Sequence, residues 1–162
     1  MSIITVNIGM AELRALNHPG ILTTLGLGSC VGIALYDRKT KIIGLAHIML
    51  PSSVNAKKID NEAKYADTAI DKLLSDMYIL GADKEYITAK LAGGAQMFTL
   101  NNSSDIIRIG ERNIQATKEK LVELGIAIIA EDTGGNFGRT IEFFSENGSL
   151  RIRRLGHDTR II

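Results

Sequence analysis

The chain is poor in cysteine, proline and aromatic residues, with one cysteine, two prolines and no tryptophan among its 162 residues. A single cysteine excludes an internal disulfide, and the three scattered histidines give it no recognisable zinc-ligand spacing. No apolar run approaches the roughly 18 to 20 residues that span a bilayer, and the amino terminus lacks the pattern of a signal peptide. We therefore expect a cytoplasmic protein with a free thiol, no metal site and no membrane insertion.

Charge of either sign is not in excess. The 19 basic and 18 acidic residues give a formal net charge of +1 and are spread without a long block. This distribution does not support a nucleic-acid partner, which needs a basic surface. With 45% hydrophobic residues, the chain is long enough to bury one core, and we expect a single domain over residues 1–162.

The apolar pattern alternates between the period of strands and the period of helices. Two segments have helical spacing, 66–80 and 110–124, and residues 11–16 fit either a short helix or an irregular strand. Loops are expected at 51–58 and 101–105. Strands in consecutive hairpins and between helices predict an α+β fold, a layered arrangement of mixed sheets with helices outside. The expected strands are 3–8, 21–25, 31–36, 41–49, 86–91, 126–131, 139–144 and 150–154.

The only cysteine, Cys30, directly precedes the first strand of an expected hairpin, and His47 lies on the second. If Tyr36 pairs with Lys41 across a four-residue turn, Cys30 falls opposite His47, with Cβ atoms roughly 4.5 to 5.5 Å apart. A three-residue turn would instead place Ile48 opposite the cysteine and turn the histidine to the other face. The sequence leaves both turns open.

Gly26 and Gly28 precede the cysteine and allow a close backbone turn. A thiol acts as a nucleophile when a base takes its proton and donors receive the oxyanion that it creates. The backbone N–H groups of Ser29 and Cys30 are our candidates for these donors. Taken alone, however, a cysteine or histidine on an apolar strand is more often a core residue than a catalytic one.

Five segments lie in order along the chain, at 24–31, 44–51, 90–97, 109–113 and 134–139. Together they resemble CheD, the chemoreceptor glutamine deamidase family of bacterial and archaeal chemotaxis. Ala92 departs from the family pattern, in which an aromatic residue is expected before the glycine pair. The resemblance covers nearly the whole chain. Its segments are Thr24-Leu25-Gly26-Leu27-Gly28-Ser29-Cys30-Val31, Gly44-Leu45-Ala46-His47-Ile48-Met49-Leu50-Pro51, Lys90-Leu91-Ala92-Gly93-Gly94-Ala95-Gln96-Met97, Ile109-Gly110-Glu111-Arg112-Asn113 and Gly134-Gly135-Asn136-Phe137-Gly138-Arg139.

The resemblance implies a catalytic triad of Cys30, His47 and Thr24, in a β sandwich flanked by helices like the catalytic domain of deamidating toxins. Without it, Thr23 or Ser29 would serve equally well as the hydroxyl that orients the histidine. The implied reaction hydrolyses glutamine side-chain amides of methyl-accepting chemotaxis receptors to glutamate through a cysteine thioester, with no cofactor. A CheC-type phosphatase is the second implied partner.

Two other functions remain open at this level. A non-catalytic adaptor would regulate the receptors or the CheC phosphatase by binding alone. A different cysteine hydrolase or acyltransferase would act on a small amide and would need a deep closed pocket, whereas a receptor helix requires an open groove. Arg139, Lys90 and Asp132 are further polar residues that could touch a substrate, although structural roles are favoured for them.

Overall fold

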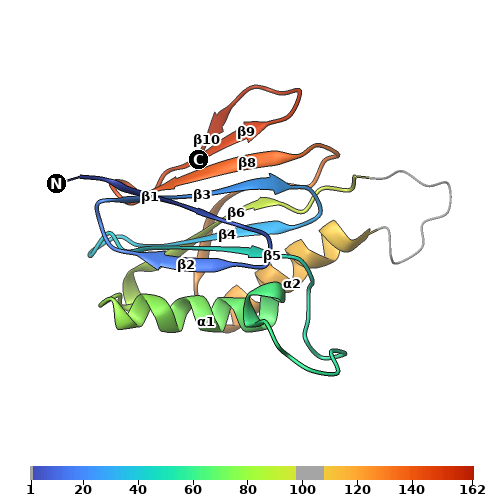
Figure 1. The fold of residues 1–162 in the computed structure, drawn as a ribbon, viewed down its shortest axis with the longest axis horizontal. Helices are drawn as coiled ribbons and strands as arrows, with labels where there is room; N and C mark the ends of the chain where they lie inside the picture. The colour runs from blue at the N-terminus through green and yellow to red at the C-terminus, as the bar shows by residue number, and fades with distance from the viewer. Residues whose placement is uncertain (1, 98–107) are drawn as a thin grey trace.

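The structure is a computed structural model that describes residues 2–97 and 108–162. Within these residues, two mixed five-stranded sheets are stacked, and two α-helices cover the outer face of one of them (Figure 1). The predicted α+β class, with layered mixed sheets and helices outside, is confirmed. Both helices lie on the same side of the sandwich, so the layers run sheet, sheet, helices.

Sheet A has the strand order β1-β3-β8-β9-β10. Its β1 and β3 pair in parallel and its other neighbours are antiparallel. The last strand lies in the tail beyond residue 155, where the sequence pattern predicted no element. The five strands are β1 (Ile4–Ile8), β3 (Gly20–Leu27), β8 (Arg139–Phe144), β9 (Leu150–Arg154) and β10 (Arg160–Ile161).

Sheet B has the order β2-β5-β4-β6-β7, with the expected hairpin β4–β5 at its centre. Residues 11–16, which fitted either a short helix or a strand, contribute β2, which pairs with β5. Only β6 and β7 are parallel. The five strands are β2 (Leu13–Leu16), β5 (Ile43–Ile48), β4 (Val31–Asp37), β6 (Ile87–Gly93) and β7 (Ala127–Thr133).

The register of the β4–β5 hairpin is neither of the two that the sequence left open, and it lies two residues away from the one with a four-residue turn. Tyr36 pairs with Ile43 instead of Lys41, and Gly32 instead of Cys30 lies opposite His47. The carboxylate of Asp37 explains this register. Its Oδ1 accepts hydrogen bonds from the two N–H groups at positions 39 and 40 and so stabilises the turn. The pairing moves by two residues, so every side chain keeps its predicted face.

A bulge interrupts β3 where it leaves sheet A. The pairing with β8 shifts between Thr24 and Leu27, and Gly26 has a positive φ of 69°. The extra residue lets both Thr24 and Leu27 point into the protein, while Leu25 between them is exposed. The bulge therefore leaves Thr24 buried on the inner face of sheet A, shortly before the chain reaches Cys30.

Both helices pack their apolar stripes against sheet B. The helix α1 (Ala66–Ile79) contacts β5 and β2, and α2 (Ile109–Glu123) contacts β7 and β4. Asn61 caps the short 3-10 helix η1 (Glu62–Lys64) and not α1, which begins after Tyr65 without a side-chain cap. A second 3-10 turn, η2 (Lys84–Tyr86), precedes β6. The expected loop at 101–105 lies outside the described residues.

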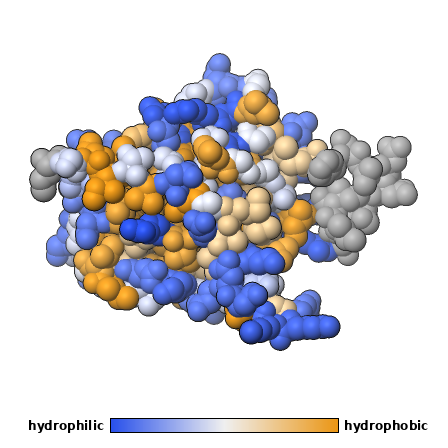
Figure 2. All heavy atoms as spheres, in the orientation of Figure 1, coloured by the Kyte–Doolittle hydropathy of each residue, from blue (hydrophilic) through white to orange (hydrophobic). Residues whose placement is uncertain are grey.

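Two apolar cores result from this layering. One lies between sheet B and the helices, and the other lies between the two sheets and contains Cys30. On the face seen in Figure 2, apolar and polar residues alternate over the surface. Among the described residues, no helix is both long and apolar enough to cross a bilayer. Cys30 is thus a buried member of the core between the two sheets.

Candidate active site

Thr24 and His47 meet across the gap between the two sheets. Thr24 points inward from β3 of sheet A, and His47 points inward from β5 of sheet B. The Thr24 Oγ1 atom lies 2.7 Å from His47 Nδ1, and both side chains are almost completely buried. Thr23, the alternative hydroxyl, instead donates to Asn7 Oδ1 at 3.0 Å on the exposed side of the strand.

The bonds of Thr24 determine the tautomer of His47. A hydroxyl carries one proton, and Thr24 donates that proton to the carbonyl of Ile8 at 2.9 Å. Its oxygen must therefore accept the short hydrogen bond from His47, which places the proton of a neutral imidazole on Nδ1. The Nε2 atom then carries a free lone pair, and it is buried without a hydrogen-bond partner among the described residues.

Cys30 shares a face with His47 but does not lie directly opposite it. It precedes Gly32, the residue paired with His47, by two positions, so the two side chains point to the same side of sheet B. Diagonal neighbours in a strand pair lie roughly 7 to 8 Å apart, and their Cβ atoms are somewhat closer. Gly32 itself has no side chain there, and the side chains of Ile141 and Leu27 pack closely over it.

Burial keeps both groups uncharged. It raises the pKa of the Cys30 thiol above its ordinary value, although the backbone N–H of the same residue acts in the opposite direction. Burial also lowers the pKa of the His47 imidazole, while the charge of Glu12 partly offsets this effect. The two resting groups are therefore a thiol and a neutral imidazole.

Two backbone bonds from the end of β6 hold the loop around the cysteine. Gly94 N–H donates to the Cys30 carbonyl, and Ala95 N–H donates to the Gly28 carbonyl, each at 2.8 Å. A Cβ atom at Gly93 would clash with the same Cys30 carbonyl oxygen, so this crossing requires glycine. Along the described chain, the N–H of Ser29 has no acceptor, and the N–H of Cys30 has none except the sulfur of its own side chain.

Asn113 is a buried polar residue of this region to which the sequence assigned no role. Its Nδ2 donates to the carbonyls of Ser29 and Met49, both at 3.0 Å, while its Oδ1 is buried and unpaired among the described residues. The signal in the sequence was spacing, because Asn113 falls four residues before Thr117 on the buried face of α2. An amide on an apolar helical stripe needs partners.

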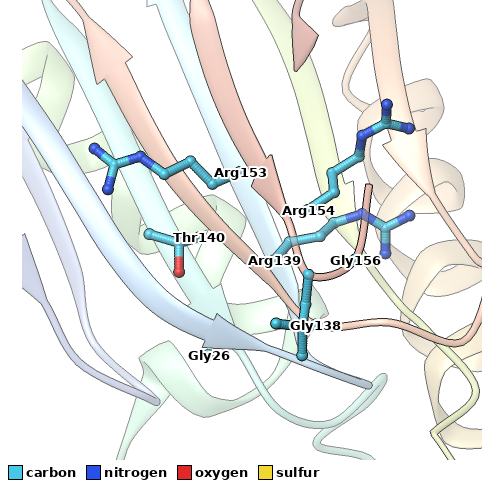
Figure 3. Close-up of a pocket in the computed structure, with 8 residues that line it drawn as sticks. Gly26, Gly138, Arg139, Thr140, Arg153, Arg154 and Gly156 are labelled. Atoms are coloured by element: carbon cyan, nitrogen blue, oxygen red, sulfur yellow. The ribbon is translucent and has the colours of Figure 1, made fainter. Parts of the chain in front are cut away.

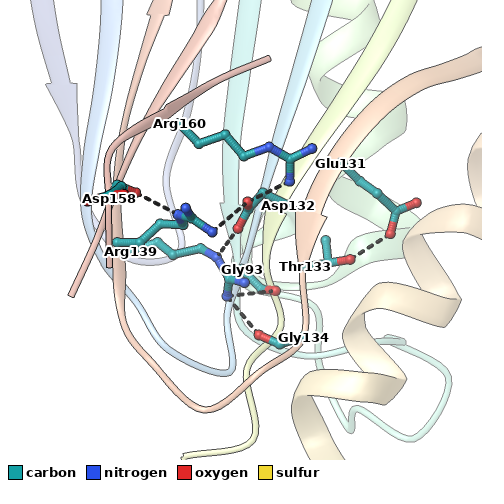
Figure 4. A network of polar contacts seen from close by, with 9 residues as sticks. Gly93, Glu131, Asp132, Thr133, Gly134, Arg139, Asp158 and Arg160 are labelled. Atoms are coloured by element: carbon teal, nitrogen blue, oxygen red, sulfur yellow. Dashed lines mark hydrogen bonds and ion pairs between the residues drawn. The ribbon is translucent and has the colours of Figure 1, made fainter. Parts of the chain in front are cut away.

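The other polar candidates have structural roles. Arg139 Nε donates to Asp132 Oδ1 at 2.8 Å, and Arg160 Nη1 donates to Asp132 Oδ2 at 2.9 Å (Figure 4). The Arg139 guanidinium also donates to the carbonyl of Gly134 at 2.9 Å. Burial alone would raise the pKa of Asp132, but these arginine bonds lower it. Lys90 donates to two backbone carbonyls of the carboxyl-terminal region.

A pocket of about 450 Å³ lies at the end of β3 and the β8–β9 pair (Figure 3). Gly26, Thr140 and Arg153 are among its lining residues, and the three triad candidates are not. Because Ile141 points into the inter-sheet core, its neighbour Thr140 faces outward. The pocket therefore lies on the opposite side of sheet A from His47. Among residues 2–97 and 108–162, no three His, Cys, Asp or Glu side chains gather as metal ligands.

Residues 49–154 match the family described as CheD chemotactic sensory transduction. A protein of Caldanaerobacter subterraneus subsp. tengcongensis, named probable chemoreceptor glutamine deamidase CheD, is 54% identical over 157 residues, which is 97% of each chain. A protein of Halalkalibacterium halodurans, named chemoreceptor glutamine deamidase CheD, is 54% identical over 149 residues, 91% of this chain and 92% of the relative. The chain belongs to the CheD family.

Proposed function

We propose that the protein is a cysteine-dependent amidohydrolase that converts specific glutamines of methyl-accepting chemotaxis receptors to glutamate. Membership of the CheD family supports the reaction and the substrate class. The observation that carries the catalytic assignment is the buried His47, whose Nδ1 is bonded to Thr24 and whose Nε2 is unpaired on the face that it shares with Cys30. A base with one nitrogen anchored and the other free suits proton transfer.

In the first half of the reaction, Cys30 Sγ attacks the side-chain carbonyl carbon of the glutamine while His47 Nε2 takes the thiol proton. Because burial favours the neutral pair, this transfer accompanies the attack and is not completed beforehand. The oxyanion is received by the backbone N–H groups of Ser29 and Cys30. His47 then protonates the leaving nitrogen, ammonia departs, and a thioester remains.

The second half of the reaction regenerates the thiol. His47 takes a proton from water, the resulting hydroxide attacks the thioester carbonyl, and the proton returns to the sulfur as the bond to carbon breaks. The products are a glutamate side chain and the free enzyme. Thr24 accepts the hydrogen bond from the Nδ1–H group throughout and so keeps Nε2 directed at the reacting atoms, as a neutral counterpart of the carboxylate in a serine protease.

The experiment mixes the protein with a receptor cytoplasmic fragment and follows the conversion of glutamine to glutamate by mass. We expect wild-type protein to convert its target glutamines, and Cys30→Ala and His47→Ala to bind the fragment without converting it. Conversion at the wild-type rate by either variant would contradict the catalytic assignment. Binding without conversion by the wild type would favour the adaptor function instead.

A second partner, a CheC-type phosphatase, and a cytoplasmic location belong to the same proposal. A free thiol nucleophile suits a reducing compartment such as the cytoplasm. In that compartment the enzyme would meet the cytoplasmic portion of a receptor. We expect the phosphatase to dock near the substrate entrance, so that receptor fragment and phosphatase compete. Titration of the phosphatase into the conversion assay should raise the apparent KM for the fragment, and an unchanged KM would contradict this docking site.

A further inference from the structure

Three consecutive backbone carbonyls, at residues 28–30, are each held by a hydrogen bond from another segment of the protein. Two of the donors are backbone N–H groups after β6, and the third is a side chain of α2. The pairs are Ala95 N–H to the Gly28 carbonyl at 2.8 Å, the Asn113 amide to the Ser29 carbonyl at 3.0 Å, and Gly94 N–H to the Cys30 carbonyl at 2.8 Å.

The direction of each N–H follows from these bonds. In a planar trans peptide the carbonyl and the next N–H point in opposite directions. Holding the Ser29 carbonyl towards Asn113 therefore aims the Cys30 N–H away from α2. By the same geometry, holding the Gly28 carbonyl towards Ala95 aims the Ser29 N–H away from Ala95. Within the described residues the Ser29 N–H has no acceptor and the Cys30 N–H has only the sulfur of its own side chain, so both can receive a ligand oxygen that forms at that sulfur.

Asn113 is the only side chain among the three donors, and it uses both of its amide protons. The second proton bonds the Met49 carbonyl at 3.0 Å, two residues after His47. The orientation of the amide is determined, since the reverse would bring Oδ1 against two carbonyl oxygens. One amide therefore joins the chain beside the thiol to the chain beside the base.

Packing of α2 supports the same arrangement. A Cβ atom at Gly110, one turn before Asn113, would clash with the carbonyl oxygens of Gly94 and Ala95, so the helix lies directly on this backbone. The Oδ1 atom of Asn113 is completely buried and unpaired among the described residues. The amide nitrogen satisfies the carbonyls of Ser29 and Met49, whereas the buried oxygen has no partner and needs an explanation beyond packing.

We propose that Asn113 is a positioning residue for the deamidation, which aims the Cys30 N–H at the oxyanion of the tetrahedral intermediate. This inference rests on the function proposed above. Asn113 touches neither the glutamine nor the sulfur. It acts through the Ser29–Cys30 peptide, and it also fixes the spacing between that peptide and the strand that carries His47.

The test compares Asn113→Leu and Asn113→Ala with the wild type, and Thr117→Val serves as the matched control. Thr117 is equally buried on α2, one turn along, and its hydroxyl bonds only within the helix. Two rates are measured, namely conversion of the receptor fragment and alkylation of Cys30 by iodoacetamide. Alkylation needs the sulfur but forms no oxyanion, so a displaced thiol lowers both rates alike, whereas a misdirected N–H lowers conversion much more than alkylation.

We expect both Asn113 variants to lose about 10- to 100-fold in kcat, with KM and the alkylation rate each within about threefold of wild type. Thr117→Val should keep its kcat within about threefold. If Asn113→Leu does not fold, Asn113→Ala carries the comparison. An unchanged kcat, a parallel fall in conversion and alkylation, or an equal loss in Thr117→Val would overturn the inference.

A Cys30→Ala arm separates this inference from the proposed function. If Cys30→Ala still converts the fragment, the cysteine mechanism fails whatever Asn113 does. If Cys30→Ala is inactive while both Asn113 variants keep the wild-type kcat, the mechanism stands and only the role of Asn113 fails.

Discussion

Two buried polar clusters lie on either side of the end of β6, and they differ in how completely their atoms are bonded. One is a charge cluster formed by Asp132, Arg139 and Arg160, in which both oxygens of Asp132 accept hydrogen bonds from the two arginines (Figure 4). In the candidate active site, His47 Nε2 and Asn113 Oδ1 are unpaired, and these are the only unpaired buried side-chain atoms found among the described residues.

The difference indicates what each cluster is for. A fully bonded buried ion pair joins segments of the fold, whereas a buried polar atom without a partner costs stability and calls for an explanation. Unpaired groups with shifted pKa values are typical of functional sites. Variants of the two clusters should therefore separate stability from activity in opposite directions.

The largest effect is expected when His47 is replaced by leucine, a side chain of similar size. His47→Leu should lower kcat by at least about 10³-fold, because the base is lost. The free energy of unfolding should fall by less than about 1 kcal/mol, since an unpaired buried nitrogen is removed and Thr24 keeps its bond to Ile8. Receptor-fragment conversion and urea unfolding measure the two quantities. A loss of several kcal/mol would mean that His47 is chiefly structural.

The reverse result is expected in the charge cluster. Asp132→Asn leaves Arg139 buried without its counter-charge, and breaking such a pair costs about 3 to 5 kcal/mol of unfolding free energy. Urea unfolding measures this loss. The kcat of the folded fraction should stay within about threefold of wild type, because Asp132 contacts no triad candidate. Near-wild-type stability would remove the distinction between the clusters.

A smaller effect is expected for Thr24→Val, which keeps the shape of the side chain but not its hydroxyl. The His47 Nδ1 proton then has no acceptor, and the imidazole loses the bond that sets its tautomer. We expect kcat to fall about 10- to 100-fold while KM changes by less than about threefold. Thr23→Val is the matched control, since its hydroxyl bonds Asn7 on the exposed side. Equal losses in both variants would contradict the role of Thr24.

The smallest effect concerns pH. Burial holds the pKa of His47 below its ordinary value of 6.5, so the unfolded chain takes up this proton first as the pH falls. The stability of the wild type relative to His47→Leu should therefore decrease below about pH 6.5, by at most about 1.4 kcal/mol per pH unit. The acid limb of kcat should likewise lie below that pH. A stability difference that grows as the pH falls would give the opposite sign.

The sequence predicted the elements of the fold better than their long-range pairing. Apolar alternation placed the strands of the central hairpin and the faces of its side chains correctly. The register depended on the bonds that the Asp37 carboxylate makes within the turn and to the N–H of Asp83 at 2.8 Å, 46 residues away. The two-residue strand β10 was missed for a similar reason, because pairing with β9 and the bond from Arg160 to Asp132 stabilise it.

The residues proposed for the site came from the sequence, but the geometry that relates them did not. Hairpin spacing and a family resemblance named Cys30 and His47, and the resemblance alone named Thr24. Strand alternation in the structure supports Thr24 over Thr23, because it places the Thr24 hydroxyl inside the protein against His47 and the Thr23 hydroxyl outside against Asn7. The contacts of Asn113 span 84 and 64 residues of sequence, and no local pattern encodes them.

The most direct test of the proposed mechanism is to detect the thioester on the Cys30 sulfur. Wild-type protein is mixed with a stoichiometric amount of receptor fragment, the reaction is quenched in acid within the first turnover, and intact masses are measured. We predict a covalent enzyme–fragment species lighter than the sum of its parts by one ammonia, with the link on the Cys30 peptide. Glutamate formed with no such species at any time, and formed equally by Cys30→Ala, would contradict the account.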